Sequence, residues 1–211
     1  MVSYKVLLFD FDGTLCDSQE QSLRIINTLA DEFKYKKINS EELRDFKNKP
    51  LRDVLKQMKI PMVRVPAIVY RARNKFHDEI DSLEPIPGIL NTLSHLKDSG
   101  FELGIVTSND QKNVEKFLNR HRIRSFNFIR GNSSVFGKAK VLKSALKELR
   151  VRENEAIYIG DETRDIEAAR SAKMKVISVT WGYNSREILV KSKPDFLVET
   201  PKELSQVLQS E

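Results

Sequence analysis

The sequence predicts an α/β protein: a doubly wound parallel sheet with an α-helical cap inserted after the first strand. Three observations support this prediction. The chain opens on a short apolar strand that ends in acidic residues, the next stretch has helical patterns throughout, and strands alternate with helices from residue 88 onward. Such alternation is typical of a parallel sheet with helices on both faces. At 211 residues, 40% of them hydrophobic, the chain suits a large domain with a smaller insert.

The first predicted strand is the apolar run VLLF at residues 6–9, and DFDGT follows it at residues 10–14. Residues two apart on an extended backbone point the same way, so we expect Asp10 and Asp12 to project together. Two carboxylates held together at a strand end repel each other unless a cation lies between them. Mg²⁺ prefers carboxylate oxygens as ligands. The pattern therefore predicts a magnesium site at the end of this strand.

Helical patterns continue from residue 18 to residue 80. Four helices are predicted, and they begin near Ser18, Ser40, Pro50 and Pro66. We expect the hydroxyl of Ser18 to cap the first of them, with Gln21 three residues further on. Prolines and a glycine at 85–88 then end the helical stretch. We assign residues 17–83 to a helical cap domain and residues 1–16 and 84–211 to the core domain, with hinges near 15–18 and 81–87.

The rest of the chain alternates between the two kinds of element. The predicted helices span 88–98, 110–121, 138–149, 163–172, 185–191 and 201–209, and the predicted strands span 102–107, 126–129, 156–160, 175–179 and 195–198. Open α/β sheets bind ligands beyond the carboxyl ends of their strands. Polar residues that directly follow these strands are therefore the candidates for a functional site.

Two segments carry groups suited to an anion. Thr107 and Ser108 follow a strand and are expected to open a helix, whose free N–H groups favour an anion. Lys138 stands at the start of another helix, where a positive charge opposes the helix dipole. That position makes sense if an anion lies in front of the lysine. Lys140, two residues further on, is a competing candidate.

Acids follow a further strand, at Asp161-Glu162-Thr163-Arg164-Asp165. Asp161 is expected to face the metal, and Asp165 to turn back toward it from the first helical turn. Capping of that helix would explain either acid alone. It does not explain why the same sheet edge also carries Asp10 and Asp12.

Together these motifs resemble those of the haloacid-dehalogenase superfamily, specifically its phosphatases of the phosphoglycolate phosphatase type. The matching segments are DFDGT at 10–14, VTSN at 106–109, GK at 137–138 and GDETRD at 160–165. The helical insert also stands where that family places its cap. The resemblance covers nearly the whole chain and implies a Rossmann-like core.

The resemblance implies a two-step hydrolysis. Asp10 is the expected nucleophile and forms an aspartyl-phosphate, and Asp12 is the expected general acid and base. Asp10, the backbone carbonyl of Asp12, and Asp161 are the expected ligands of Mg²⁺. Asp165 is expected just outside these ligands. Glu162 departs from the usual residue of the family, and it either reaches the metal or faces solvent.

Phosphate binding is implied for Thr107, Ser108 and Lys138. Relatives often have Lys-Pro where this chain has Lys138-Ala139-Lys140, so the motif alone leaves two lysines open. Residues 46–52 also resemble the cap loop of phosphoglycolate phosphatases. The positive charges of Lys47, Lys49 and Arg52 in this loop would suit an acidic leaving group.

The implied function is Mg²⁺-dependent hydrolysis of a small phosphorylated metabolite similar to phosphoglycolate. Dehalogenases of the superfamily lack an acid at the position of Asp12, which argues against that activity. Two alternatives stay open: a sugar phosphomutase on the same fold, and a non-catalytic protein that binds phosphate or regulates. The sequence does not indicate an oligomeric state.

Composition gives weaker indications. The net charge is +6, but the basic residues are scattered among acids, so we expect a solvated surface and no nucleic-acid partner. The single cysteine, Cys16, excludes an internal disulfide and fits a reducing compartment. The first residues form neither a secretory signal nor a membrane span. We therefore expect a cytoplasmic protein without a membrane partner.

Overall fold

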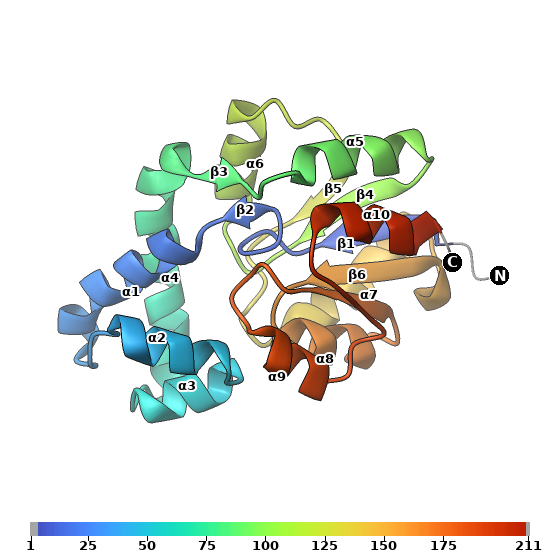
Figure 1. Cartoon of the computed structure of the whole chain (residues 1–211). Helices are drawn as coiled ribbons and strands as arrows, with labels where there is room; N and C mark the ends of the chain where they lie inside the picture. The colour runs from blue at the N-terminus through green and yellow to red at the C-terminus, as the bar shows by residue number, and fades with distance from the viewer. Residues whose placement is uncertain (1–3, 210–211) are drawn as a thin grey trace.

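The computed structural model describes residues 4–209, so the ends of the predicted core domain, 1–3 and 210–211, lie outside it. A six-stranded parallel sheet runs in the order β5-β4-β1-β6-β7-β8 (Figure 1). The strands are β1 (Val6–Phe9), β4 (Glu102–Val106), β5 (Phe126–Arg130), β6 (Ala156–Gly160), β7 (Lys175–Val179) and β8 (Phe196–Val198). After β1 the chain builds one half of the sheet and then the other. Sheets of this type bind ligands at such a reversal point.

Helices cover both faces of the sheet, which confirms the predicted fold class (Figure 1). Leu7 and Phe9 of β1 point to one hydrophobic layer, and Val6 and Leu8 point to the other, as strand alternation requires. The first layer is covered by α5 (Ile89–Asp98), α6 (Gln111–Arg120) and α10 (Pro201–Gln209). The second is covered by α7 (Lys138–Leu149), α8 (Thr163–Ser171) and α9 (Arg186–Lys191). Within residues 4–209, no helix is long and apolar enough to cross a bilayer.

Four helices stand together beside the sheet, and we call them the helical insert (Figure 1). They are α1 (Gln19–Phe33), α2 (Ser40–Lys47), α3 (Leu51–Gln57) and α4 (Val65–Glu79). Short 3₁₀ turns lie at Met62–Arg64, Ile80–Ser82 and Glu153–Glu155. Helix α1 packs along α4. Its buried residues are Ile25, Leu29 and Ala30, whose spacing places them on one face of the helix.

The two crossings between the sheet and the helical insert pair with each other. Strand β2 (Cys16–Asp17) runs antiparallel to β3 (Glu84–Pro85). The sequence did not predict this ribbon, because two-residue strands carry no periodic pattern. The predicted side-chain cap of α1 is also wrong. The Ser18 hydroxyl makes no capping bond and instead lies 3.0 Å from the hydroxyl of Tyr183.

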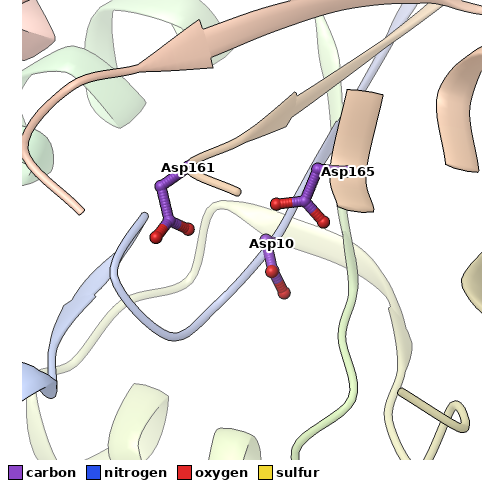
Figure 2. Close-up of side chains that lie close together, drawn as sticks. All are labelled: Asp10, Asp161 and Asp165. Carbon is purple, nitrogen blue, oxygen red and sulfur yellow. The ribbon is translucent and has the colours of Figure 1, made fainter. Parts of the chain in front are cut away.

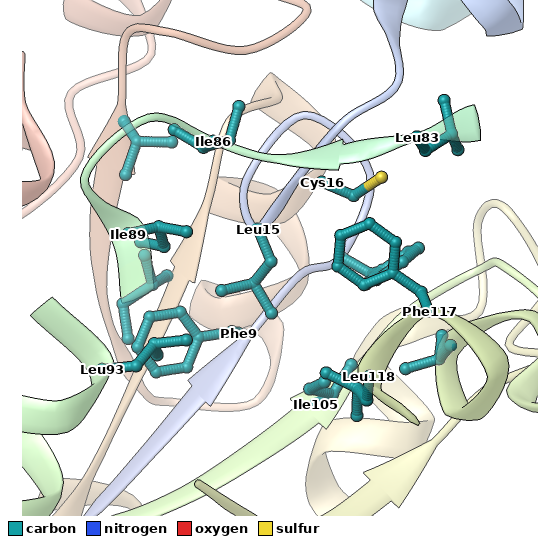
Figure 3. Close-up of a cluster of buried hydrophobic side chains, with 14 of the residues drawn as sticks. Phe9, Leu15, Cys16, Leu83, Ile86, Ile89, Leu93, Ile105, Phe117 and Leu118 are labelled. Atoms are coloured by element: carbon teal, nitrogen blue, oxygen red, sulfur yellow. The ribbon is translucent and has the colours of Figure 1, made fainter. Parts of the chain in front are cut away.

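An apolar cluster beside these crossings ties them to the core (Figure 3). It joins side chains from β1, both crossings, β4, α5 and α6, among them Phe9, Leu15, Cys16, Leu83, Ile86, Ile89, Leu93, Ile105, Phe117 and Leu118. The ring of Phe117 packs edge-on against Phe11, with their centroids 5.1 Å apart. Cys16 is fully buried there. Apolar packing therefore fixes the loop that follows β1, residues 10–15, through Phe11 and Leu15.

We expect Phe117→Ala to lower the free energy of unfolding by about 3–5 kcal/mol, because it removes a buried ring and leaves a cavity. Urea denaturation would measure the loss. Tyr70→Ala is the control, since Tyr70 is 63% exposed on α4 and should change stability little. Equal losses in both variants would contradict the assignment of Phe117 to the core.

Candidate active site

Three carboxylates meet at the carboxyl-terminal edge of the sheet (Figure 2). Asp10 directly follows β1, Asp161 directly follows β6, and Asp165 projects from the first turn of α8. One oxygen from each lies within 4.8 Å of the others, and all three side chains are buried. They meet because β1 and β6 are neighbouring parallel strands that end at the same edge. We call these residues the carboxylate cluster.

Two glycines let loops close around the cluster. Gly13 has a φ of 72°, in the left-handed region that glycine adopts without strain. A Cβ at Gly13 would lie 2.5 Å from Oδ2 of Asp161 and 2.5 Å from a ring carbon of Tyr183. A Cβ at Gly182 would lie 2.2 Å from the same carboxylate oxygen. Asp161 is thus enclosed by backbone from two loops, and neither loop has room for a side chain there.

Lys138 places its ammonium between two members of the cluster. Its Nζ donates to Oδ2 of Asp10 at 2.7 Å and to Oδ1 of Asp165 at 2.6 Å. Burial pushes the pKa of Lys138 down, but the two carboxylates outweigh burial and the pKa is raised overall. The lysine is therefore charged at neutral pH. Lys140 is exposed, so of the two candidate lysines only Lys138 reaches the cluster.

The cluster carries more negative charge than Lys138 balances. Asp161 accepts bonds from the Thr14 hydroxyl at 2.8 Å and the Tyr183 N–H at 2.7 Å. Even so, burial and the neighbouring acids raise its pKa well above the usual range. Burial, with a contribution from Asp10, also raises the pKa of Asp165, to about 6. Buried oxygen donors with excess negative charge fit a divalent cation.

Asp12 lies beside the cluster but is not part of it. Its two oxygens accept from Nδ2 of Asn109 at 3.2 and 2.9 Å. Burial, and then the charge of Asp10, raises the pKa of Asp12 to about 7. A carboxyl group of this kind can hold a proton near neutral pH and release it. Asn109 was not singled out from the sequence, although it stands within the VTSN motif.

Thr107 and Ser108 lie in a loop after β4, and the prediction that they open a helix is wrong. Helix α6 begins at Gln111, and Asp110 caps it by accepting from the N–H of Lys112 at 2.8 Å. The Thr107 hydroxyl oxygen instead accepts the N–H of Asn109 at 3.1 Å. Thr107 is fully buried, whereas Ser108 lines a cavity that also reaches Asp12 and extends into the helical insert.

Glu162 neither faces solvent nor belongs to the carboxylate cluster. Its side chain is 13% exposed and pairs with the guanidinium of Arg164. A second nitrogen of Arg164 lies 3.5 Å from the hydroxyl of Ser108, and both arginine and glutamate line the cavity. The sequence pattern indicates no role for Arg164 beyond its place in the GDETRD motif.

Another arginine comes from the helical insert. Arg73 on α4 donates to the backbone oxygens of Ser108 at 2.7 Å and Ser133 at 2.8 Å. These bonds join the insert to the loop after β4 and to the segment before α7. No pattern marked Arg73 in the sequence, because a single arginine on a polar helix face is ordinary.

The predicted basic loop of the insert touches the core but finds partners of its own. Nζ of Lys47 donates to Gln19 at 2.7 Å, and Lys49 pairs with Asp45. The guanidinium carbon of Arg52 lies 5.0 Å from the ring centre of Phe136. Only the two lysines of the three predicted residues line the cavity.

The fold and this site define a doubly wound α/β protein that gathers carboxylates where the strand order of its sheet reverses. Comparison with known proteins agrees: the haloacid dehalogenase-like hydrolase family matches residues 7–179. The chain belongs to this family. It is 32% identical to a phosphoglycolate phosphatase of Synechococcus elongatus, a match that covers 97% of each chain. It is 29% identical to the pyrophosphatase PpaX of Bacillus cereus, with 96% of this chain and 95% of that one covered.

Solved structures agree with the fold. A predicted phosphatase from Clostridium acetobutylicum superposes with a TM-score of 0.84 at 27% identity and covers 99% of both chains. A haloacid dehalogenase-like hydrolase from Streptococcus pneumoniae superposes with a TM-score of 0.80 at 26% identity, covering 98% of this chain and 99% of that one. The family and enzyme class predicted from the four motifs are therefore confirmed.

We expect Mg²⁺ to raise the melting temperature by roughly 5–10 °C at a hundredfold excess over its Kd. The physical reason is relief of repulsion within the buried carboxylate cluster. Differential scanning fluorimetry, with chelator as the reference state, would measure this shift. Asp161→Asn should lose most of it.

The matched control is Asp31→Asn on α1, since the Asp31 side chain is 83% exposed and far from the cluster in sequence and fold. This variant should keep the full shift. An identical Mg²⁺ response in wild type and Asp161→Asn would place the cation elsewhere.

Proposed function

We propose that this chain is a Mg²⁺-dependent phosphomonoester hydrolase that acts on a small phosphorylated metabolite through an aspartyl-phosphate. The environment of Asp10 carries this proposal. Its carboxylate ends the central strand at the reversal point of the sheet, bonds the ammonium of Lys138 at 2.7 Å, and belongs to the carboxylate cluster. Relatives named as a phosphatase and a pyrophosphatase support phosphate as the group that is transferred.

Asp10 is the nucleophile in this proposal. Its Oδ1 accepts the N–H of Phe11 at 2.8 Å while Lys138 bonds Oδ2, so the carboxylate is held in one orientation. An oriented nucleophile lowers the entropic cost of attack on phosphorus. Lys138, Thr107 and Ser108 then hold the phosphoryl oxygens, whose charge the ammonium offsets.

Asp12 is the general acid and base. Asp12 lies two residues after Asp10 on the loop that follows β1, and the side chain of Asn109 donates a hydrogen bond to it. It lines the cavity in which the leaving group would lie. In the first step it gives its proton to the departing alcohol oxygen. In the second it takes a proton from the water that attacks the aspartyl-phosphate.

Asp10, Asp161 and the backbone carbonyl of Asp12 would hold Mg²⁺, with Asp165 beside them. The oxygen-only donor set fits this metal better than zinc. Bound Mg²⁺ would supply charge neutralisation for the phosphoryl group. Asp165 positions Lys138 through their 2.6 Å bond and accepts the N–H of Glu162 at 3.0 Å.

The helical insert, residues 17–83, acts as a cap domain over the leaving group. Its contacts with the core support this role: Arg73 bonds the loop after β4, and the Lys47 carbonyl accepts the N–H of Ser185 at 2.8 Å. A cover of this kind excludes water and limits the size of the substrate. The relative named as a phosphoglycolate phosphatase makes 2-phosphoglycolate the first small ester to test, and Lys47 of the basic loop lines the cavity.

Asp10→Asn should lower kcat for phosphate release by about a thousandfold or more, because the amide is a poor nucleophile. The assay measures inorganic phosphate released from 2-phosphoglycolate and from other small esters with Mg²⁺ present. Mass spectrometry of acid-quenched wild type should find a phosphoryl group on the Asp10 peptide. Wild-type turnover by the variant would rule out the covalent mechanism.

Lys138→Ala and Lys140→Ala form a matched pair for the phosphate site. We expect the first to lose about a hundredfold or more in kcat/KM, because it removes the buried ammonium at Asp10. The second removes an exposed charge and should stay within about twofold of wild type. Circular dichroism checks that both fold. Comparable losses in the two variants would contradict the assignment of Lys138.

A further inference from the structure

A cavity of about 350 Å³ extends from the candidate active site into the helical insert. Asp12, Ser108 and Arg164 line it on the core side. On the insert side all four helices contribute, and the lining there is predominantly apolar, with side chains such as Ile26, Phe46, Val54 and Val69. We call this second part the apolar hollow. The site is thus polar where the phosphoryl group would lie and apolar beyond it.

The whole cavity, polar part and hollow together, measures about 350 Å³ and is partly open to solvent. Interiors are close-packed and leave few voids bigger than a water molecule, since a void forfeits dispersion contacts. An apolar cavity of about 150 Å³ already stays dry and binds benzene. Pockets of about 300–1,000 Å³, mostly apolar with a few polar groups, are typical of small-molecule sites.

The helices of the insert around the hollow are held by contacts with each other and with the core. Helices α1 and α4 pack on each other. The loop between α2 and α3 is fixed to the core instead, where Nδ2 of Asn184 donates to the carbonyls of Lys47 and Lys49 at 3.3 Å. The Ser185 hydroxyl donates to the side-chain oxygen of Asn48 at 2.6 Å. The helical insert is therefore in contact with the core. Because Asp12 and the hollow line the same cavity, an alcohol released near Asp12 would lie next to the hollow.

From this geometry we infer that the substrate of the site is a phosphomonoester whose alcohol carries an apolar aliphatic or aromatic body that fills the hollow. The inference rests on the proposed function. The inferred leaving group differs from glycolate, which is charged and has almost no apolar surface to bury. Of the basic loop, Lys49 is paired with Asp45, and Arg52 packs on Phe136 outside the cavity lining. Lys47 lines the cavity with its ammonium bonded to the amide oxygen of Gln19, and most of the lining around it on the insert side is apolar.

Hydrolysis of this substrate proceeds in two steps. Asp10 forms a bond to phosphorus as the bond from phosphorus to the alcohol oxygen breaks, and that oxygen takes the proton of Asp12. Water then attacks phosphorus, gives its proton to Asp12 and releases Asp10 and inorganic phosphate. Asp12 lines the cavity, so the protonated oxygen leaves at the boundary between the polar part and the hollow.

The test uses n-alkylphosphonates from methyl to octyl, which are not hydrolysed, with binding measured by calorimetry in the presence of Mg²⁺. Each buried methylene should tighten Kd roughly fourfold until the hollow is full. The matching alkyl phosphates should show the same trend in kcat/KM and exceed 2-phosphoglycolate. A flat series, or tightest binding of phosphonoacetate, would overturn the inference.

Two variants on α4 test the location. Ala72 lines the apolar hollow, so Ala72→Phe should fill part of it and weaken hexylphosphonate at least tenfold relative to methylphosphonate. Ala67 is exposed on the same helix, and Ala67→Phe should leave that ratio unchanged. An unchanged ratio in Ala72→Phe would overturn the location. The wild-type series stands without either variant if one fails to fold.

The two proposals fail in different ways. Chain-length-dependent binding without hydrolysis of any ester would support the hollow as a binding site and overturn the proposed hydrolysis. Hydrolysis of phosphoglycolate with a flat phosphonate series would support the hydrolase and overturn the apolar substrate.

Discussion

The buried ion pairs between Lys138 and the carboxylates of Asp10 and Asp165 are the constraint on which the site depends. Buried carboxylates this close repel each other, and an unpaired buried charge is costly. The ammonium offsets part of that cost and links β1, α7 and α8. The remaining negative charge, seen in the raised pKa of Asp161, makes the edge of the sheet a place for a cation. Fold and chemistry thus share one set of interactions.

Two loops near the carboxylate cluster fix the position of Asp161. Gly13 and Gly182 allow two backbones to approach Asp161 closely, and the Tyr183 N–H bonds that carboxylate. The hydroxyl of Tyr183 lies 3.0 Å from Ser18 at the start of α1. One residue therefore connects the cluster to the beginning of the helical insert. A movement of the helical insert would therefore displace Tyr183 through this contact and the loop after β4 through Arg73.

In the proposed function, the core and the helical insert recognise different parts of a phosphate ester. The core supplies charged and hydrogen-bonding groups, which in the proposed function hold the phosphoryl group. The helical insert supplies apolar surface around a cavity of about 350 Å³. Because phosphate binding is common to all phosphate esters, discrimination among them must come from the leaving group. Under the proposed function, the shape and polarity of the apolar hollow would set this discrimination.

The sequence by itself determined the parallel sheet, nearly every helix and strand after residue 88, and the approach of Asp10, Asp161 and Asp165 to one sheet edge. These follow from local periodicity and from the rule that parallel strands end at one edge. The strand pattern also predicted Asp12 to project together with Asp10, but the structure leaves Asp12 outside the carboxylate cluster. Only the tertiary structure decided the partner of Ser18 and the ribbon of β2 with β3. The contacts of Arg73 and Arg164 and the apolar hollow belong to the same group. Each depends on which distant segments pack together, and no local pattern encodes that.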